Sequence, residues 1–355
     1  MNPINNSVIL EDMENIYRRP LDWTIFDKKT VLITGAYGML ASYVCFYLCY
    51  LHEEKHIDVR ILAQGRNKDK MRNRFGELCD SSFFQPLYFN ILSPINIDEP
   101  VDYIIHAAGG ANPRLYSTNP VEVAEANTIG TYNLLKYASE INSKGFLFFS
   151  SGDVYGKINN RDYILEDDFG ASDQLSDHAC YSEGKRMGET FCRTFWLEYN
   201  VPTVIARIGH TYGPTMDVES DPRVFASFMR SVLHGEDIVM LSDGLAKRPF
   251  CYVADAVYAY LLLLINGKRG EAYNVCNTHE FINMRDLAAI MVGLRSDIDL
   301  HVEYKERQGD DSYVENQENK ANLPSSEKLE KLGFVFEFTT AEGFGNVLRY
   351  YNEKN

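Results

Sequence analysis

Three side chains in the middle of the sequence have types and spacing suited to acid–base chemistry: Ser151, Tyr181 and Lys185. Tyr181 and Lys185 are four residues apart, so on a helix they share one face. A phenol, with an ordinary pKa of about 10, is a poor base at neutral pH, but a nearby ammonium favours the phenolate. Such pairs are common on helices. Ser151 makes this one informative, because a hydroxyl at the end of a strand would hold the oxygen that Tyr181 deprotonates.

A glycine-containing turn near the start of the chain predicts a dinucleotide site. It reads Thr-Gly-Ala-Tyr-Gly-Met-Leu-Ala over residues 34–41, between an apolar strand and a helix. Gly35 allows the tight turn, and Gly38 lets the backbone approach a pyrophosphate at the N-terminus of the helix, where free N–H groups favour anions. The alternative is an ordinary strand–helix turn. The strand before it and the helix after it favour the dinucleotide.

The segment after the second expected strand leaves the choice of dinucleotide open. An acidic residue there binds the ribose hydroxyls of NAD, but this chain has Gly65 and Arg66. Arg66 would meet the 2′-phosphate of NADP, stack on the adenine, or lie on the surface. NAD is preferred slightly, with NADP as the alternative.

Strands and helices alternate through the first two thirds of the chain. Strands are expected at 30–34, 57–63, 87–90, 101–107, 145–150 and 202–208, and helices at 39–51, 68–79, 120–141 and 182–199. This order predicts an α/β fold with a doubly wound parallel sheet of the Rossmann type.

The remaining segments indicate a smaller α/β lobe. Helices are expected at 223–234, 254–265, 285–294, 326–332 and 340–351, a strand at 272–275 and a polar loop at 305–325. The expected organisation is a 1–29 extension containing a short helix at 9–18, a 30–209 dinucleotide-binding domain to which some later segments return, and a 210–355 substrate lobe. The extension receives no function; packing on the body or on a partner is expected.

Composition excludes several classes of protein. A net charge of -15 disfavours nucleic acid and anionic membranes as partners. The seven cysteines are scattered, without a Cys-x-x-Cys pair, and no metal site is expected. The N-terminus lacks the pattern of a signal peptide, and the longest apolar runs are too short to span a bilayer, so we expect a cytoplasmic protein.

The ordered motifs resemble the extended short-chain dehydrogenases/reductases, the NAD-dependent epimerase/dehydratase family. Besides the residues above, the resemblance covers about residues 30–350 and rests on His106-Ala107-Ala108, Asn119-Pro120, Asn127-x-x-Gly130-Thr131, Arg207-x-x-x-x-Tyr212-Gly213-Pro214, Arg248-x-Phe250-Cys251-Tyr252-Val253-x-Asp255 and Tyr273-Asn274-Val275.

The resemblance implies roles for individual residues. Tyr181 would be the catalytic base, Lys185 would tune it and hold the nicotinamide ribose, and Ser151 would bind the reacting hydroxyl of a nucleotide-sugar. Hydride would leave C4 of the sugar, and a second event would follow on the 4-keto sugar. The implied cofactor contacts are Gly35, Tyr37, Gly38, Met39, Arg66, Ala107, Ala108, Asn127 and Lys185; the implied substrate contacts are Arg114, Tyr116, Arg223, Arg248 and Arg307, with surface arginine as the alternative for the last three. A homodimer through helices near 120–140 and 182–199 is usual in the family.

The residues after Ser151 bear on the second event. The 4,6-dehydratases of the family carry Thr-Asp-Glu there, whereas this chain has Ser151-Gly152-Asp153. UDP-glucuronate decarboxylases have a hydroxyl, a small residue and Glu, so Asp153 keeps the carboxylate, one methylene shorter, and decarboxylation is narrowly preferred. Epimerisation, dehydration, NADPH-dependent reduction of a 4-keto sugar, a redox sensor without catalysis, and a turn-capping role for Asp153 remain alternatives.

Overall fold

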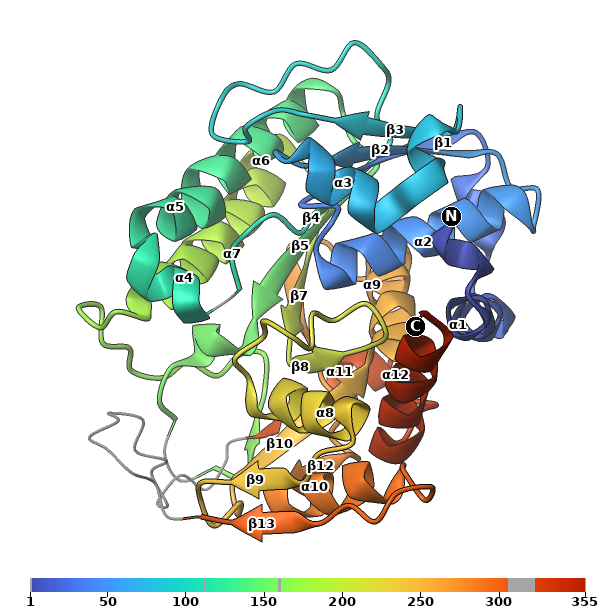
Figure 1. Cartoon of the computed structure of the whole chain (residues 1–355). Coiled ribbons are helices and arrows are strands. Elements are labelled where there is room, and N and C mark those ends of the chain that lie inside the picture. Colours follow the sequence, from blue (N-terminus) through green and yellow to red (C-terminus); the bar gives the residue numbers. More distant parts are fainter. Residues whose placement is uncertain (1, 112, 159–160, 306–322, 355) are drawn as a thin grey trace.

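A seven-stranded parallel sheet forms the centre of the computed structural model, which describes residues 2–111, 113–158, 161–305 and 323–354 (Figure 1). The strand order is β11-β7-β5-β4-β1-β2-β3. The sheet therefore starts at β1 and winds in both directions, as expected for a Rossmann-type fold. The strands are β1 (Lys29–Thr34), β2 (Val59–Gln64), β3 (Phe84–Leu87), β4 (Tyr103–His106), β5 (Gly145–Ser151), β7 (Thr203–Ile208) and β11 (Glu271–Val275).

Helices cover both faces of this sheet, which explains why the strands are apolar runs without alternation. In β1, Val31 and Ile33 belong to one hydrophobic core and Leu32 to the other. The first core is completed by α2 (Met39–Glu53), α3 (Lys68–Phe75) and α9 (Val253–Asn266), and the second by α6 (Thr131–Glu140) and α7 (Ala179–Tyr199).

A second group of elements lies beyond the carboxyl ends of the strands, at the bottom of Figure 1. Its helices are α8 (Val224–His234), α10 (Met284–Gly293) and α12 (Thr340–Lys354). Its strands are β8 (His210–Tyr212), β10 (Lys247–Tyr252) and β12 (Phe281–Asn283) in one sheet, β9 (Ile238–Met240) with β13 (Val302–Tyr304), and β6 (Tyr163–Ile164) with β14 (Leu323–Pro324).

Several expected elements need correction. The third strand runs over Phe84–Leu87 and not 87–90, because Phe84 is buried against Phe75 with ring centres 4.7 Å apart. Pro86 is tolerated because β3 is an edge strand. The helix expected at 68–79 ends at Phe75, where Gly76 adopts a φ of 52° and a 3-10 turn follows over Gly76–Asp80.

Two further boundaries differ. The helix expected at 120–141 contains α5 (Pro120–Glu125), a π-helical turn (Ala126–Gly130) and α6, and the helix expected at 326–332 is only the short α11 (Glu327–Glu330). Within the expected loop at 305–325, residues 323–324 form β14, and 306–322 lie outside the described residues.

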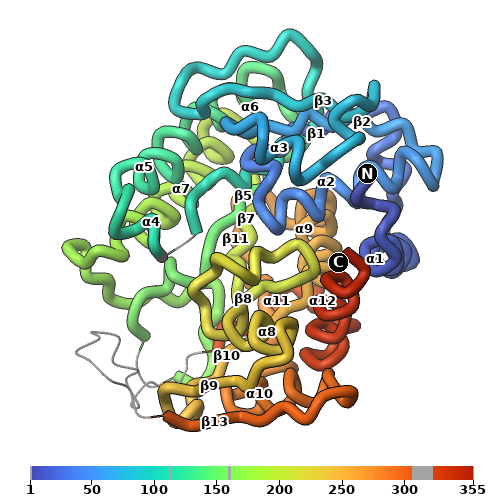
Figure 2. Tube along the Cα trace, viewed as in Figure 1, coloured from blue at the N-terminus to red at the C-terminus, as the bar shows by residue number. Residues whose placement is uncertain are grey.

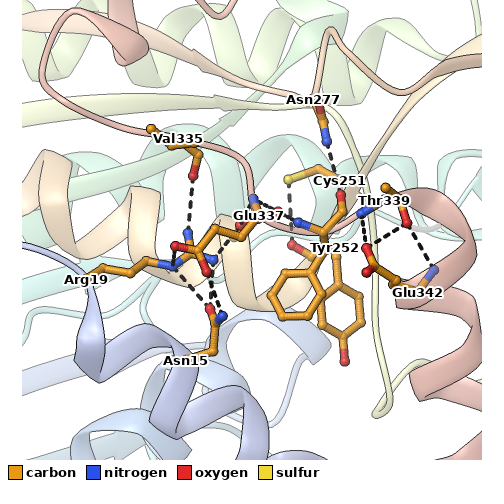
Figure 3. A network of polar contacts seen from close by, with 11 residues as sticks. Asn15, Arg19, Cys251, Tyr252, Asn277, Val335, Glu337, Thr339 and Glu342 are labelled. Carbon is orange, nitrogen blue, oxygen red and sulfur yellow. Dashed lines mark hydrogen bonds and ion pairs between the residues drawn. The ribbon is translucent and has the colours of Figure 1, made fainter.

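The N-terminal extension packs onto the body through α1 (Ser7–Arg18), beside α12 at the opposite end of the chain (Figure 2). Arg19 forms a buried ion pair of 2.6 Å with Asp255 of α9. Arg19 also contacts Asn15, and its Nη1 donates to the carbonyl oxygen of Val335 (Figure 3). The same Asp255 accepts the backbone N–H of Glu337. One carboxylate therefore joins the extension, α9 and the segment before α12.

A second buried carboxylate strengthens this attachment. The Oδ2 atom of Asp12 accepts hydrogen bonds from the phenols of Tyr43 at 2.6 Å and Tyr252 at 2.7 Å. Burial raises the pKa of Asp12 to about 7, against the opposing effect of the two phenols. Residues from the extension, α2 and β10 thus share one polar cluster inside the core.

The cysteines and the long helices are consistent with an ordinary protein interior. All seven cysteines are free thiols, and burial raises the pKa of Cys45 and Cys49. Among the described residues, no helix has the length and apolar character needed to cross a membrane.

Candidate active site

The turn after β1 is built for close backbone approach. Gly35 has a φ of 65°, and a Cβ atom there would lie 2.8 Å from the Cα atom of Ala108. Its N–H donates to the Oε1 atom of Gln64 at 3.1 Å. Gly38 is the N-cap of α2 and offers no side chain to bond the first N–H groups, which begin at Met39. A pyrophosphate fits the N-terminus of this 15-residue helix.

The segment after β4 lies against this turn, at the carboxyl ends of β1 and β4, where the strand order reverses. Dinucleotides bind at such a reversal, and this place is called the groove below. The N–H of Ala108, which follows Ala107, donates to the hydroxyl of Thr34 at 3.3 Å. His106 is buried between the hydroxyls of Thr34 and Thr131, at 2.8 and 3.0 Å, and burial lowers its pKa to about 3. The histidine of this motif therefore links β1, β4 and α6 as a neutral side chain.

An unpartnered acceptor marks the far end of the groove. The Oδ1 atom of Asn127 is buried and has no hydrogen-bond partner among the described residues. A Cβ atom on Gly109 would lie 2.4 Å from this oxygen and 3.1 Å from the Nζ atom of Lys185. The bare glycine thus leaves space that an acceptor and an ammonium both face. Such an acceptor without a partner and a neighbouring ammonium are suited to the hydroxyls of a ribose, which donate and accept.

Lys185 and Tyr181 are positioned by α7. Two small residues of this helix, Gly184 and Gly188, let it approach the π turn and β5; a Cβ on Gly188 would lie 2.5 Å from the ring of Phe148. The Nζ atom of Lys185 donates to the carbonyl oxygen of Phe149 at 2.6 Å and lies 5.7 Å from the centre of the Tyr181 ring. Burial lowers the pKa of Lys185 to about 7.

Ser151 and Asp153 complete the cluster at the carboxyl end of β5. The Ser151 hydroxyl accepts the backbone N–H of Asp153 at 3.2 Å and also contacts the phenol of Tyr181. Burial and the carboxylate of Asp153 raise the pKa of Tyr181 well above its ordinary value, and Ser151 and Arg223 oppose this. Positive charge near the phenol, as Lys185 supplies, is what lowers such a pKa. Asp153 is open to solvent on one side, and desolvation on its protein side raises its pKa against the charge of His178.

Two aromatic side chains, Tyr116 and His178, pack beside Tyr181. The ring of Tyr116, on α4 (Pro113–Thr118), stacks on Tyr181 with centres 5.0 Å apart, and Arg114 lies on the same short helix. His178 packs edge-on against Tyr116 at 4.6 Å. His178 was missed from the sequence. Its position three residues before Tyr181, one helical turn away, was the available signal.

Two of the three expected phosphate-binding arginines come together around His210. Burial and the charges of Arg248 and Arg223 lower the pKa of His210 to about 3. The guanidinium of Arg223 is held by Asp221, with Nε 2.9 Å from the nearer carboxylate oxygen. Arg248 lies on β10, which pairs with the β8 strand of His210. Arg307 lies outside the described residues.

Arg66 and Tyr37 lie on the other side of the groove. The ring of Tyr37 covers Gly65, where a Cβ atom would lie 2.5 Å from its Cε1 atom. Arg66 forms an ion pair with Glu122 of α5. Its charge is therefore already matched, and the sequence argument for NADP loses its basis.

Comparison with known proteins identifies the family. The sequence profile described as "NAD dependent epimerase/dehydratase family" matches residues 31–276. The chain belongs to this family. It is accordingly an enzyme with NAD as its cofactor, and the groove described above has the features that this cofactor needs.

Other members of the NAD-dependent epimerase/dehydratase family resemble the chain along most of its length. UDP-glucuronic acid decarboxylase 1 of Danio rerio is 29% identical over 92% of this chain and 74% of that protein. UDP-glucuronic acid decarboxylase 6 of Arabidopsis thaliana is 30% identical over 76% of each chain. dTDP-D-glucose 4,6-dehydratase of Mus musculus is 27% identical over 92% of this chain and 89% of that protein.

Solved structures share the fold. UDP-glucose 4-epimerase of Thermotoga maritima superposes with a TM-score of 0.75 at 22% identity, covering 92% of this chain and 99% of the other. UDP-glucuronic acid 4-epimerase of Bacillus cereus, in complex with UDP-glucuronic acid and NAD, superposes with a TM-score of 0.73 at 20% identity, covering 92% and 100%.

Proposed function

We propose that this enzyme remodels the sugar of a nucleotide-sugar and that its reaction is the decarboxylation of a UDP-glucuronate-type substrate. The observation that carries the choice is the side-chain set beside Tyr181: the hydroxyl of Ser151, no side chain at Gly152, and the carboxylate of Asp153. The named relatives at 29–30% identity include UDP-glucuronic acid decarboxylases, which supports the same choice.

The proposed first step uses Ser151, Tyr181 and Lys185. Ser151 holds the C4 hydroxyl of the sugar, and Tyr181 accepts its proton as the C4–H bond breaks. NAD, when bound, supplies the acceptor for the hydride and a positive charge near the phenol. The ammonium of Lys185, fixed by the carbonyl of Phe149, adds to that charge. These charges counter the burial that raises the pKa of Tyr181.

The proposed second step follows from the ketone at C4. A carboxylate on C5 is then β to a carbonyl, so the C5–C6 bond breaks, CO2 leaves, and the electron pair is delocalised onto the C4 oxygen. C5 must next receive a proton. Asp153 has a raised pKa and lies beside Tyr181, which suits it to hold that proton. The hydride then returns to C4 and Tyr181 gives its proton back to the C4 oxygen, so the decarboxylated alcohol leaves and no cofactor is consumed.

We further propose that Arg223 and Arg248 bind the diphosphate. Guanidinium groups suit phosphate oxygens, and both arginines surround the neutral His210. Asp221 fixes Arg223, which prevents that side chain from folding away. Tyr116 and Arg114 are proposed for the sugar pocket, where Tyr116 stacks on the catalytic phenol.

A homodimer is also proposed, through α6 and α7. Apolar side chains are exposed on these helices and on the π turn before α6: Ile129 is 46%, Tyr132 44%, Leu197 63% and Tyr199 54% exposed. The rings of Phe191 and Phe195 pack edge-on against the ring of Tyr132. A second copy covering these helices would remove this surface from water.

The test is conversion without added cofactor. The purified protein is incubated with UDP-glucuronate, UDP-glucose, dTDP-glucose, GDP-mannose and a CDP-sugar, and products are identified by mass. Loss of CO2 from UDP-glucuronate is expected. Loss of water, or altered stereochemistry at constant mass, would replace decarboxylation by dehydration or epimerisation. Turnover only of a keto sugar with added NADPH would identify a reductase.

A further inference from the structure

The ion pair between Arg66 and Glu122 crosses the point where the strand order reverses. Arg66 follows β2 by two residues, on one side of β1, and Glu122 lies on α5, after β4 on the other side. Between them lies the carboxyl end of β1, which carries the Gly35 turn. Dinucleotides bind in the crevice at such a reversal. The pair therefore joins the loop after β2 to α5 across the groove.

The residues that end β2 leave the usual carboxylate position without an acid. The amide of Gln64 is committed, because its Oε1 accepts the N–H of Gly35 and its Nε2 donates to the carbonyl of Phe89 at 2.6 Å. Gly65 lies under the Tyr37 ring, and Arg66 follows. Glu122, which lies on α5 on the other side of the groove, supplies a carboxylate here through its pair with Arg66.

We propose that Glu122 is the residue that selects NAD against NADP. It neutralises Arg66, the cation that would otherwise attract a 2′-phosphate, and places a negative charge where that phosphate would enter. A phosphate of this kind carries a charge of about -1.5 to -2, so the two groups repel. The inference rests on the dinucleotide groove proposed above.

Both side chains of the pair are partly exposed, so the pair can influence dinucleotide choice without closing the site. The Arg66 side chain is 56% exposed and that of Glu122 is 44% exposed. Exposed pairs of this kind change an equilibrium by at most about fivefold. Glu122 thus biases the choice of dinucleotide without sealing the groove.

Competitive loading tests the inference. Each protein is freed of nucleotide or allowed to exchange in an equimolar mixture of NAD and NADP, separated from free nucleotide and denatured, and the released nucleotides are quantified by mass spectrometry. Glu122→Gln is expected to raise the NADP:NAD ratio up to about fivefold, since it removes a repulsion and frees Arg66. Adding Arg66→Leu to that variant is expected to cancel most of the rise. Glu125→Gln, which removes the same charge from the same helix without touching the pair, is the matched control.

The outcomes are distinct. A ratio in Glu122→Gln equal to that of wild type, with NAD still taken up, would overturn the inference alone. An equal rise in Glu125→Gln would overturn it too, because net charge would then be the cause. Wild-type protein that takes up neither dinucleotide would overturn the proposed function as well.

Discussion

The ammonium of Lys185 and the carbonyl oxygen of Phe149 are 2.6 Å apart, so β5 holds the lysine beside the ring of Tyr181. The lysine is fully buried there, and its pKa falls to about 7. Because this bond fixes the side chain before any ligand arrives, Tyr181 does not depend on substrate binding to meet its neighbouring cation. The relationship makes the phenol the first residue to test.

Tyr181→Phe removes the proposed base and keeps the ring that stacks on Tyr116. We expect turnover of UDP-glucuronate to fall by about 10²–10⁴-fold, the usual contribution of a general base. Bound NAD, measured by mass spectrometry after denaturation, is expected to stay at the wild-type level. Tyr199→Phe, the same substitution at the exposed end of α7, is the control. Full activity of Tyr181→Phe would reject the assignment.

Asp153→Asn separates the two proposed steps. We expect C4 oxidation to continue and protonation at C5 to slow, so product forms at least about tenfold more slowly, within the range for a lost proton donor. Mass spectrometry of quenched reactions is expected to show a decarboxylated 4-keto sugar, two hydrogens lighter than product. If the variant makes product at the wild-type rate, Asp153 is not the proton donor.

Gly35→Ala tests the turn after β1. An alanine there has a strained φ, costing about 1–2 kcal/mol, and its Cβ meets the backbone of Ala108. We expect lower thermal stability and loss of copurified NAD. Gly293→Ala is a matched control, since open space surrounds its Cβ and helix propensity favours alanine by about 1 kcal/mol. Retention of NAD by Gly35→Ala would show that the turn does not contact the cofactor.

Asp12 gives a prediction for stability against pH. Its folded pKa of about 7 lies above the ordinary value of 3.8, so between these values the folded state binds one more proton than the unfolded state. Stability must then fall as pH rises from about 4 to 7, by up to about 4 kcal/mol from this group. In Asp12→Asn, whose amide oxygen still accepts from Tyr43 and Tyr252, we expect this contribution to vanish in urea denaturation series.

Glu11→Gln is the control for that series. It removes an exposed carboxylate one residue away, which pairs with Arg349 at the surface. Its slope of stability against pH is expected to stay close to wild type, because the Glu11 charge makes only a minor contribution to the raised pKa of Asp12. An equal change of slope in both variants would mean that Asp12 is not the group responsible.

Leu197→Lys tests the proposed dimer. The side chain is 63% exposed on α7, so a lysine there is expected to cost the folded monomer little. Light scattering on wild type is expected to give twice the 40.6 kDa of one chain, and the variant is expected to give one. Leu175→Lys, at a site 96% exposed, is the control. A monomeric wild type would contradict the proposal.

Local signals predicted the parts of the site that depend on residue type and spacing. The Gly35 turn and Ser151 lie at the ends of strands, and Tyr181 and Lys185 share one face of a helix. Strand ends and helix faces can both be located from the periodicity of apolar residues. Most central strands were found for the same reason. Burial on both faces makes them continuous apolar runs, as in β1 and β5.

Contacts between distant segments could not be predicted in this way. The pairing of Arg66 with Glu122 and of Asp12 with Tyr43 depends on how segments distant in the sequence pack together, and no periodicity records it. The two- and three-residue strands of the second group of elements are too short to show alternation. The third strand lies three residues before its expected position, because the edge position of β3 accepts Pro86 within the strand.

The sheet has a consequence for biosynthesis. One of its two edge strands, β11, ends at Val275, whereas its neighbour β7 ends at Ile208. At a translation rate of about 5–20 residues per second, the ribosome needs several seconds to make the segment between them. During that interval β7 is an unpaired edge on a nascent chain, open to association with other polypeptides. Chaperones that shield strand edges should therefore raise the yield of this protein most when β11 is delayed.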